Sequence, residues 1–285
     1  MNIGGYALVT GAGMQSFSRI HPTDRPPLTS LRSGIGLTCA QRYAEKNAAD
    51  VAFADLDLRT AERAAEESLG LMTNPDYRAI FIRVDVTQET DVEDMVKETR
   101  KEFGRIDHAV NCAGVNLVAR VSAKAKGEIA EQTTADLDDV MNVNYKDMYY
   151  CVRAEINAMK EQEPRTVSPR DPNRGVTRGT IVNLGSLAPY AAVPGNSAHG
   201  TSKHAVLGLS KYAALDAAKY HIRVNYLCPS WVDTPMVRRM LDKRPGARGD
   251  IERMTPMGPM AQPGEVADVA IFLSSPKSSY VTGVG

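Results

Sequence analysis

Residues 6–36 read YALVT GAG MQSFSRIHPTDRPPLTSLR SGIG, and the two glycine clusters of this stretch decide the fold class. The apolar run at 6–10 predicts a buried strand, and a helical pattern over 34–47 follows the second cluster. Glycines between a strand and a helix let the backbone turn tightly and approach an anion, which the free N–H groups of the first helical turn stabilise. The stretch therefore predicts a phosphate-binding strand–turn–helix unit.

Residues 14–32 separate the two glycine clusters and are rich in Pro, Ser and Arg. Strand-to-helix loops usually contain about 2–6 residues, so this irregular insertion is unusual. Its excision leaves TGAGSGIG and restores a short loop. We interpret it as a retained intron or a similar insertion that interrupts the turn. A second irregular segment, at 163–178, is predicted to form a long loop.

Short apolar runs alternate with helical patterns along the rest of the chain. The runs predict strands at 6–10, 51–55, 79–85, 108–112, 180–184 and 223–228. The helical patterns cover 34–47, 58–69, 89–103, 135–162, 199–220 and 264–274. This alternation predicts an α/β protein whose doubly wound parallel sheet is covered by helices on both faces. We expect a single domain over residues 1–285, with ligands bound beyond the carboxyl ends of the strands.

Composition excludes several classes of protein. Lys+Arg and Asp+Glu both number 34, and this balance argues against a nucleic-acid partner, which normally selects a basic excess. The chain has no signal-peptide pattern and no run of about 20 apolar residues, so we expect a cytoplasmic protein without a membrane contact. The cysteines are widely spaced and form no CxxC pair, which predicts neither a zinc site nor a disulfide framework: Cys39, Cys112, Cys151 and Cys228.

Asp55 ends the second predicted strand, about 20 residues after Gly36. A carboxylate at this place can accept hydrogen bonds from the adenosine ribose hydroxyls of a dinucleotide and repels a 2′-phosphate. Taken alone, Asp55 also fits the less favoured interpretation of an ordinary strand-end residue. Together with the glycine turn it predicts NAD as the cofactor, in preference to NADP.

The motifs that follow the strands resemble those of the short-chain dehydrogenase/reductase family, from about Gly5 to the last residue. Departures are Cys112, in the segment after the fourth predicted strand, and Ser230, where the family usually has glycine. In chain order the matching segments are Asp85-Val86, Asn111-Cys112-Ala113-Gly114, Val143-Asn144, Asn183-Leu184-Gly185-Ser186, Thr201-Ser202-Lys203 and Cys228-Pro229-Ser230-Trp231-Val232-Asp233-Thr234-Pro235.

The resemblance implies a Rossmann fold and roles for individual residues. Ser186 is expected to hold the substrate oxygen, Lys203 to bind the nicotinamide ribose, and Asn144 to anchor a proton-relay water. Cofactor contacts are implied at Gly11, Gly34, Ile35, Gly36, Asp55, Asp85, Val86, Asn111, Ala113, Gly114, Lys203, Val232 and Thr234.

His199 occupies the position of the family's catalytic tyrosine, four residues before Lys203. Residues i and i+4 share a helix face, so the imidazole and the ammonium group are expected side by side. A neutral imidazole can accept an alcohol proton, and nearby positive charge favours that neutral form. Three interpretations stay open: a working acid/base, a chain that has lost redox turnover, and an isolated substitution in an ordinary dehydrogenase.

The sequence thus predicts an NAD(P)-dependent oxidoreductase that interconverts a secondary alcohol and a ketone on a hydrophobic, cyclic small molecule. The resemblance is to members from fungal secondary metabolism, and it implies a homodimer or homotetramer packed through the helices at 135–162 and 199–220. The chain stops at Gly285, where family members continue, so a truncated seventh strand is expected. The alternative is an NAD-binding protein of the same fold without redox turnover.

Overall fold

The computed structural model describes residues 2–12, 34–114, 128–244 and 246–285, and the predicted insertion at 14–32 lies outside them. Its main sheet is parallel, with the strand order β3-β2-β1-β4-β7-β8. The order reverses beside β1, as in a doubly wound sheet, and confirms the predicted fold class. The strands are β1 (Tyr6–Thr10), β2 (Asp50–Asp55), β3 (Arg78–Arg83), β4 (His108–Asn111), β7 (Gly179–Leu184) and β8 (Ile222–Leu227).

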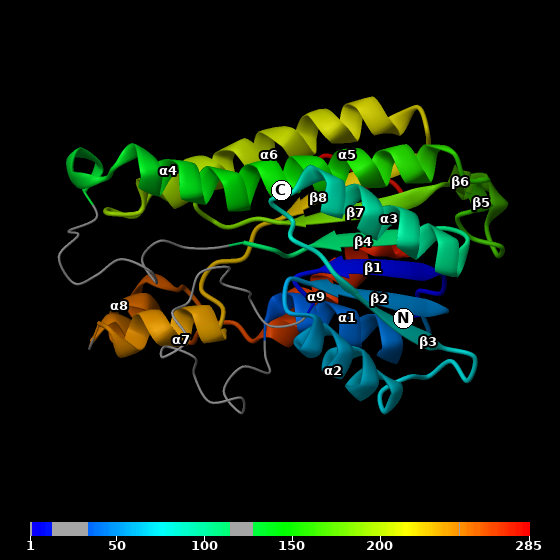
Figure 1. Cartoon of the computed structure of the whole chain (residues 1–285), viewed down its shortest axis with the longest axis horizontal. Helices are drawn as coiled ribbons and strands as arrows, with labels where there is room; N and C mark the ends of the chain where they lie inside the picture. Colours follow the sequence, from blue (N-terminus) through cyan, green and yellow to red (C-terminus); the bar gives the residue numbers. More distant parts are fainter. Residues whose placement is uncertain (1, 13–33, 115–127, 245) are drawn as a thin grey trace.

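Helices cover both faces of this sheet (Figure 1). One face packs against α1 (Ile35–Glu45), α2 (Leu58–Leu69) and α9 (Pro263–Ser274), around the buried Tyr43 and Phe53. The other face packs against α3 (Glu89–Phe103), α5 (Asp147–Lys160) and α6 (Ser197–Ala218), around Met148 and Ile181. A sheet buried on both sides needs strands without polar alternation, which is why the strand runs are visible in the sequence.

Three segments differ from their predicted form. The helix expected at 135–162 consists of α4 (Thr134–Met141), a π-helical turn η5 (Asn142–Lys146) and α5. The segment 163–178 contains a small antiparallel hairpin, β5 (Arg165–Thr166) and β6 (Val176–Thr177), in place of a plain loop. After β8 the chain forms two helices that the sequence pattern did not reveal, α7 (Pro235–Asp242) and α8 (Ala247–Met254). Short 3₁₀ turns lie at η4 (Ile129–Glu131), η6 (Pro172–Arg174) and η7 (Pro276–Ser278).

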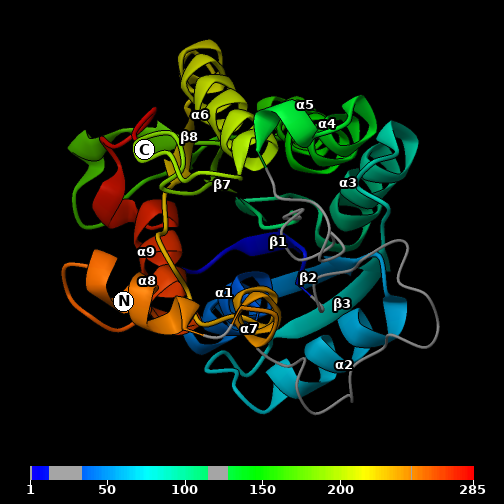
Figure 2. The same ribbon diagram turned by 90° about the vertical axis from the view of Figure 1, so that its left-hand side faces the viewer.

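The two ends of the sheet are built differently (Figure 1). The helices α4, α7 and α8 lie at the end where β7 and β8 finish, and the β5–β6 hairpin lies at the opposite end. Figure 2 looks onto the first of these ends, where ligands of doubly wound sheets bind. Next to β8, Tyr226 N donates to Val284 O (2.9 Å) and Gly283 N donates to Val224 O (2.8 Å), so residues near Gly285 run along the sheet edge.

Polar side chains cross the core between β4, β7 and α5. Asn111 Nδ2 donates to Glu155 Oε2 (3.0 Å) and to Asn183 Oδ1 (3.1 Å), and Asn183 Nδ2 donates to Ser210 Oγ (2.9 Å). Burial raises the pKa of Glu155 to about 8. Glu155 is therefore largely protonated at neutral pH, a state that fits its fully buried position. Of the helices that the described residues form, none combines the length and apolar character needed to cross a membrane.

Candidate active site

The two glycine clusters meet in space although residues 14–32 separate them in the sequence. Gly11 has φ +63, and a Cβ at Gly36 would overlap the Gly11 carbonyl oxygen. No larger residue fits at Gly36 without displacing this backbone. Gly34 precedes α1; no atom of a described residue lies within 4 Å of a Cβ built there, and no side chain of a described residue caps the helix N-terminus. N–H groups without a side-chain cap beside a glycine turn suit the pyrophosphate of a dinucleotide, and Ile35 is the first residue of this helix.

Asp55 lies beside this cradle at the end of β2. Its side chain is buried and Oδ1 accepts a hydrogen bond from Asp57 N (3.1 Å). The neighbouring Ala54 O accepts from Ala12 N (3.2 Å), which fixes the end of β1 against the end of β2. The carboxylate is thus positioned where the sequence places it, next to the glycine turn.

Asp85 and Val86 follow β3 along the same sheet edge. The strand ends at Arg83, two residues earlier than expected, because the Asp85 side chain forms a turn. Asp85 Oδ1 accepts from Thr87 N (3.1 Å) and Thr87 Oγ1 (2.7 Å). Val86 packs against the core on the α3 side of the sheet. Both residues line the approach to the sheet edge.

The segment after β4 brings two kinds of residue to the site. The side chain of Asn111 is used inside the core, so any cofactor contact there comes from the backbone. Ala113 and Gly114 are half-buried at the edge. A Cβ at Gly114 would lie 3.4 Å from Asn144 Oδ1 and 3.7 Å from Lys203 Nζ. The backbone of Gly114 therefore faces both polar groups.

The π-helical turn carries Asn144 toward α6. Asn144 Nδ2 donates to Ser202 Oγ (3.1 Å), and Ser202 Oγ donates to His199 O (2.7 Å). Lys203 Nζ donates to Leu184 O at the end of β7 (3.2 Å). The half-buried His199 lies one helical turn before Lys203, on the same face of α6. The structure thus brings together the predicted proton-transfer position, the lysine and the asparagine.

Ser186 lies at the end of β7, two residues after Leu184. Its Oγ accepts from Ala188 N (3.1 Å). Its backbone is held by Tyr226, whose hydroxyl accepts from Ser186 N (2.8 Å) and donates to Ser186 O (3.0 Å). A Cβ at Gly185 would overlap the Tyr226 ring, so glycine is required beneath it. Sequence reasoning missed Tyr226, and the glycine directly before Ser186 was the available signal.

Val232 and Thr234 complete the edge after β8. Val232 is buried and forms a parallel bridge with Ala261, and Asp233 N donates to Ala261 O (2.8 Å). Thr234 caps α7, because its Oγ1 accepts from Val237 N (3.4 Å). This cap and bridge fix the segment that the sequence assigns to the nicotinamide end of the cofactor.

A buried carboxyl group, that of Asp147, interacts electrostatically with Lys203. Asp147, the first residue of α5, is 1% exposed. Burial lowers the pKa of Lys203, and the nearby Asp147 carboxylate opposes this shift. Burial likewise raises the pKa of Asp147 well above its ordinary range, and the Lys203 charge opposes that shift. Asp147 was not predicted; its place in the sequence three residues after Asn144 was the only signal.

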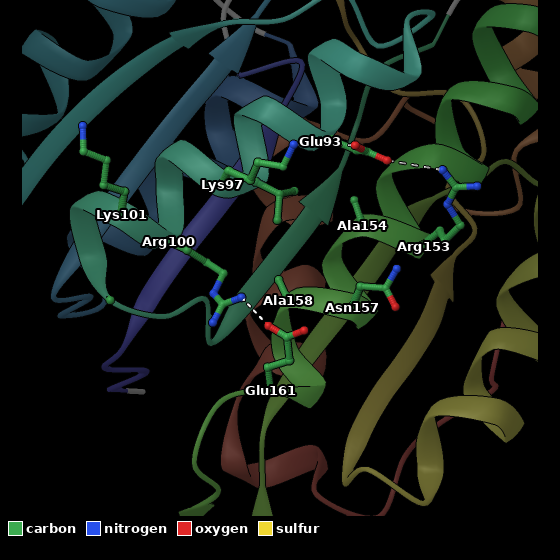
Figure 3. Close-up of a pocket in the computed structure, with 11 residues that line it drawn as sticks. Glu93, Lys97, Arg100, Lys101, Arg153, Ala154, Asn157, Ala158 and Glu161 are labelled. Atoms are coloured by element: carbon green, nitrogen blue, oxygen red, sulfur yellow. Dashed lines mark hydrogen bonds and ion pairs between the residues drawn. The ribbon is translucent and has the colours of Figure 1, made fainter.

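A groove of about 450 Å³ between α3 and α5 contains none of these residues (Figure 3). Its walls carry the ion pair Arg100–Glu161 (2.9 Å) and a contact between Arg153 and Glu93 (3.7 Å). Its lining contains none of the predicted cofactor residues, and we assign it no part in the site at the sheet edge.

Fold and site together are those expected of an α/β oxidoreductase that binds a dinucleotide. The family model described as Enoyl-(Acyl carrier protein) reductase matches residues 30–284. The short-chain dehydrogenase fogB of Aspergillus ruber is 44% identical over 252 residues, which cover 88% of this chain and 90% of fogB. The 2,5-dichloro-2,5-cyclohexadiene-1,4-diol dehydrogenase of Sphingobium indicum is 33% identical over 256 residues, 90% of this chain and 91% of that protein.

Among solved structures, a short-chain type dehydrogenase/reductase from Mycobacterium marinum superposes with a TM-score of 0.77 at 27% identity, covering 99% of this chain and 93% of that one. The chain belongs to the short-chain dehydrogenase/reductase family, whose members act on CH–OH groups with NAD(P).

Proposed function

We propose that this protein is an NAD(H)-dependent dehydrogenase that interconverts a secondary alcohol and a ketone on a hydrophobic, cyclic molecule. The observation that carries the proposal is that Ser186, His199 and Lys203 lie at the carboxyl edge of the sheet. Asn144 is hydrogen-bonded to Ser202 on α6, the helix that also carries His199 and Lys203. We place the enzyme in the cytoplasm, where NAD is available.

The residues of the chain divide the chemistry among them. NAD supplies the hydride acceptor, and the protein supplies position and proton transfer. Ser186 Oγ orients the substrate oxygen, and His199 takes the alcohol proton during oxidation and returns it during reduction. Lys203 holds the ribose beside Gly114. Asn144, fixed by Ser202, anchors the outer end of the proton path. Val232 and Thr234 orient the carboxamide group of the nicotinamide ring.

The surroundings of the site favour an apolar substrate. Leu187, Tyr190 and Val193 follow Ser186 and expose large apolar surfaces, and Met257, after α8, is 90% exposed. Apolar groups left exposed beside polar catalytic residues are typical of a site for a hydrophobic ligand. The named diol dehydrogenase acts on a cyclic diol, which supports a cyclic substrate here.

Exposed apolar residues on α6 support a homo-oligomer. Tyr212 and Leu215 are 73% and 75% exposed, and Tyr149 on the neighbouring α5 is also exposed. We propose that two copies pack through α5 and α6, as a dimer or as half of a tetramer, because burying such side chains stabilises an interface.

Cofactor choice is expected to depend on Asp55. Replacing Asp55 by Ala should lower the ratio of NAD to NADP affinity by about tenfold or more, because hydrogen bonds to a charged group contribute about 1.5–3 kcal/mol. Isothermal titration with each nucleotide measures this ratio. The matched control is Asp57→Ala, which removes the cap of α2 two residues away and should leave the ratio unchanged. Tighter binding of NADP to the wild-type chain contradicts the assignment.

Turnover is expected to depend on Ser186. The variant Ser186→Ala should lower kcat for cyclic alcohols by about 10²-fold, because one donor to the developing oxyanion is lost. NAD affinity should not change, since the side chain faces the substrate. The control Ser168→Ala lies between β5 and β6, at the opposite end of the sheet. Equal kcat values for the two variants remove Ser186 from the mechanism.

A second candidate function is that of a cofactor-binding protein without redox turnover; only the histidine at position 199, in place of the family's tyrosine, favours it. This function predicts that NAD stabilises the fold against heat and that no alcohol in a broad panel yields NADH.

A further inference from the structure

A cavity of about 190 Å³ lies at the amino ends of the strands, at the end of the sheet opposite the candidate active site. Its walls include the starts of β4, β7 and β8, the end of α9 with the turn η7, and the β5–β6 hairpin (Figure 1). Since a strand rises about 3.3 Å per residue, the six residues of β7 separate the cavity from the carboxyl edge by roughly 20 Å. This amino-edge cavity is therefore separate from the candidate active site.

The register of three neighbouring strands forms one wall of the cavity. His108, Thr180 and Arg223 are paired directly across the parallel sheet, so their side chains project from the same face. Burial lowers the pKa of His108, which keeps the imidazole neutral at neutral pH. Gly4 O only accepts, so the imidazole proton lies on Nε2, which donates to it (3.0 Å), and Nδ1 accepts from Thr180 Oγ1 (3.0 Å). In this row of side chains, Arg223 alone carries a charge.

Arg223 is half-buried and forms no ion pair with a carboxylate of the described residues. Its Nη1 donates to Val281 O (3.0 Å), and its Nη2 donates to Ser275 O (3.3 Å) at the C-terminus of α9. Carbonyl groups at a helix C-terminus stabilise a cation, which explains part of this placement. A guanidinium group has five N–H donors, so three have no acceptor among the described residues. Burial lowers the pKa of Arg223 to about 10, and the group stays charged at neutral pH.

The charged groups at the cavity are mainly positive. Asp107 is the only carboxylate among the described residues that line it. Both of its oxygens already bind arginines: Oδ1 accepts from Arg105 Nε (2.7 Å) and Oδ2 accepts from Arg165 Nη1 (2.9 Å). Three guanidinium groups, those of Arg105, Arg165 and Arg223, therefore accompany one carboxylate. A charge that is partly removed from water costs free energy, and a bound anion offsets that cost.

Two serine hydroxyl groups in the cavity wall also have a proton to donate. The buried Ser274 Oγ accepts from the Tyr43 hydroxyl (2.6 Å), and Ser279 Oγ accepts from Arg174 Nη2 (2.7 Å). Neither hydroxyl donates to a described residue, although each has one O–H group. Arg223, Ser274 and Ser279 therefore present N–H and O–H groups to whatever occupies the cavity. Donors combined with positive charge select an oxyanion.

We propose that the amino-edge cavity binds a small oxyanion, through a phosphate or carboxylate group held by the Arg223 guanidinium and the hydroxyls of Ser274 and Ser279. The guanidinium fork matches two oxygens of either group. A cavity of about 150 Å³ holds a molecule of the size of benzene, so this one accommodates an anion of about ten non-hydrogen atoms or fewer. The anion links β8 to the end of α9 and to η7. Its binding does not depend on the proposed redox function.

The first test detects the anion at the cavity wall. In protein labelled at histidine Cε1, NMR titration with inorganic phosphate or malonate should shift the His108 resonance saturably, and sodium chloride at equal ionic strength should not. The resonance is assigned by its loss in His108→Gln. Phosphate that binds only in the glycine turn, at the opposite edge of the sheet, leaves His108 unchanged. A response to phosphate alone assigns the site to phosphate groups, and a response to malonate alone assigns it to carboxylates.

The second test links this response to the named donors. Arg223→Lys and Ser274→Ala should each raise the midpoint of the His108 titration about fivefold or more, because each variant loses a hydrogen bond to the anion. The matched control is Arg63→Gln on α2, an exposed arginine paired with Glu67, and it should leave the midpoint unchanged. Ser279→Ala removes one half-buried hydroxyl and provides the same test should Arg223→Lys not fold.

A His108 resonance that responds to neither anion overturns the proposal, because the cavity then holds water alone. A midpoint that stays at its wild-type value in Arg223→Lys, Ser274→Ala and Ser279→Ala overturns it as well, because the anion is then bound by other groups.

Discussion

Replacing His199 by Asn should lower kcat for alcohol oxidation by about 10²–10³-fold, while the affinity for NAD stays unchanged. General acid–base catalysis by a positioned side chain contributes about 10²–10⁴-fold, and the amide cannot accept the alcohol proton. The imidazole is not among the groups that hold the cofactor, so binding is preserved. Steady-state kinetics and isothermal titration on the same preparations measure the two quantities.

The matched control is His204→Gln, on the same helix and five residues further along. Its ring is exposed and Nδ1 lies 2.8 Å from Gly200 O, away from the groups that surround Lys203. Its kcat should equal that of the wild-type chain. If His199→Asn retains wild-type kcat, the proton is transferred by another group and the imidazole has no catalytic role.

Replacing Glu155 by Gln should reduce the pH dependence of stability between about pH 5 and pH 8. Burial raises the pKa of this carboxyl from its ordinary 4.5 to about 8. Between these values the unfolded chain has lost the proton and the folded chain keeps it, so the free energy of unfolding falls as the pH rises. At 1.36 kcal/mol per pH unit, the full window corresponds to a loss on the order of 5 kcal/mol.

The amide introduced by Glu155→Gln cannot ionise and its oxygen still accepts from Asn111, so this variant should gain stability relative to wild type as the pH rises. Urea unfolding at about pH 5.5 and about pH 8.5 should show a relative gain of about 3 kcal/mol. The exposed Glu98→Gln is the control and should show no such gain. Parallel pH profiles for wild type and Glu155→Gln would mean that Glu155 is ionised in the folded protein.

The sheet could be predicted from sequence because most of its strand positions are apolar and the strands lie between helical patterns. The structure confirms the fold class and places the glycine clusters, Asp55 and the residues around Lys203 at one edge of the sheet. The helices α7 and α8 were not predicted, because short amphipathic segments such as Pro235–Asp242 leave only two turns of periodicity.

The polar contacts inside the core could not be predicted. Asn111 looked like a cofactor residue from its motif, yet its amide is bonded to Glu155 and Asn183. Neither partner is near it in sequence, and hydrogen bonds between distant elements leave no periodic signal. Tyr226 and Asp147 were missed for the same reason, because the interactions of each form only when β8 and α5 pack beside α6.

The most direct test of the proposed function measures NAD binding and NADH formation in one preparation of the wild-type chain. Isothermal titration establishes binding, and the absorbance of the reduced nicotinamide follows turnover with a panel of cyclic secondary alcohols that includes cyclohexanol and 2-tetralol. The account predicts that NAD binds and that at least one cyclic alcohol yields NADH at a rate that Ser186→Ala lowers by about 10²-fold. Saturable NAD binding with no NADH formed from any member of the panel contradicts it.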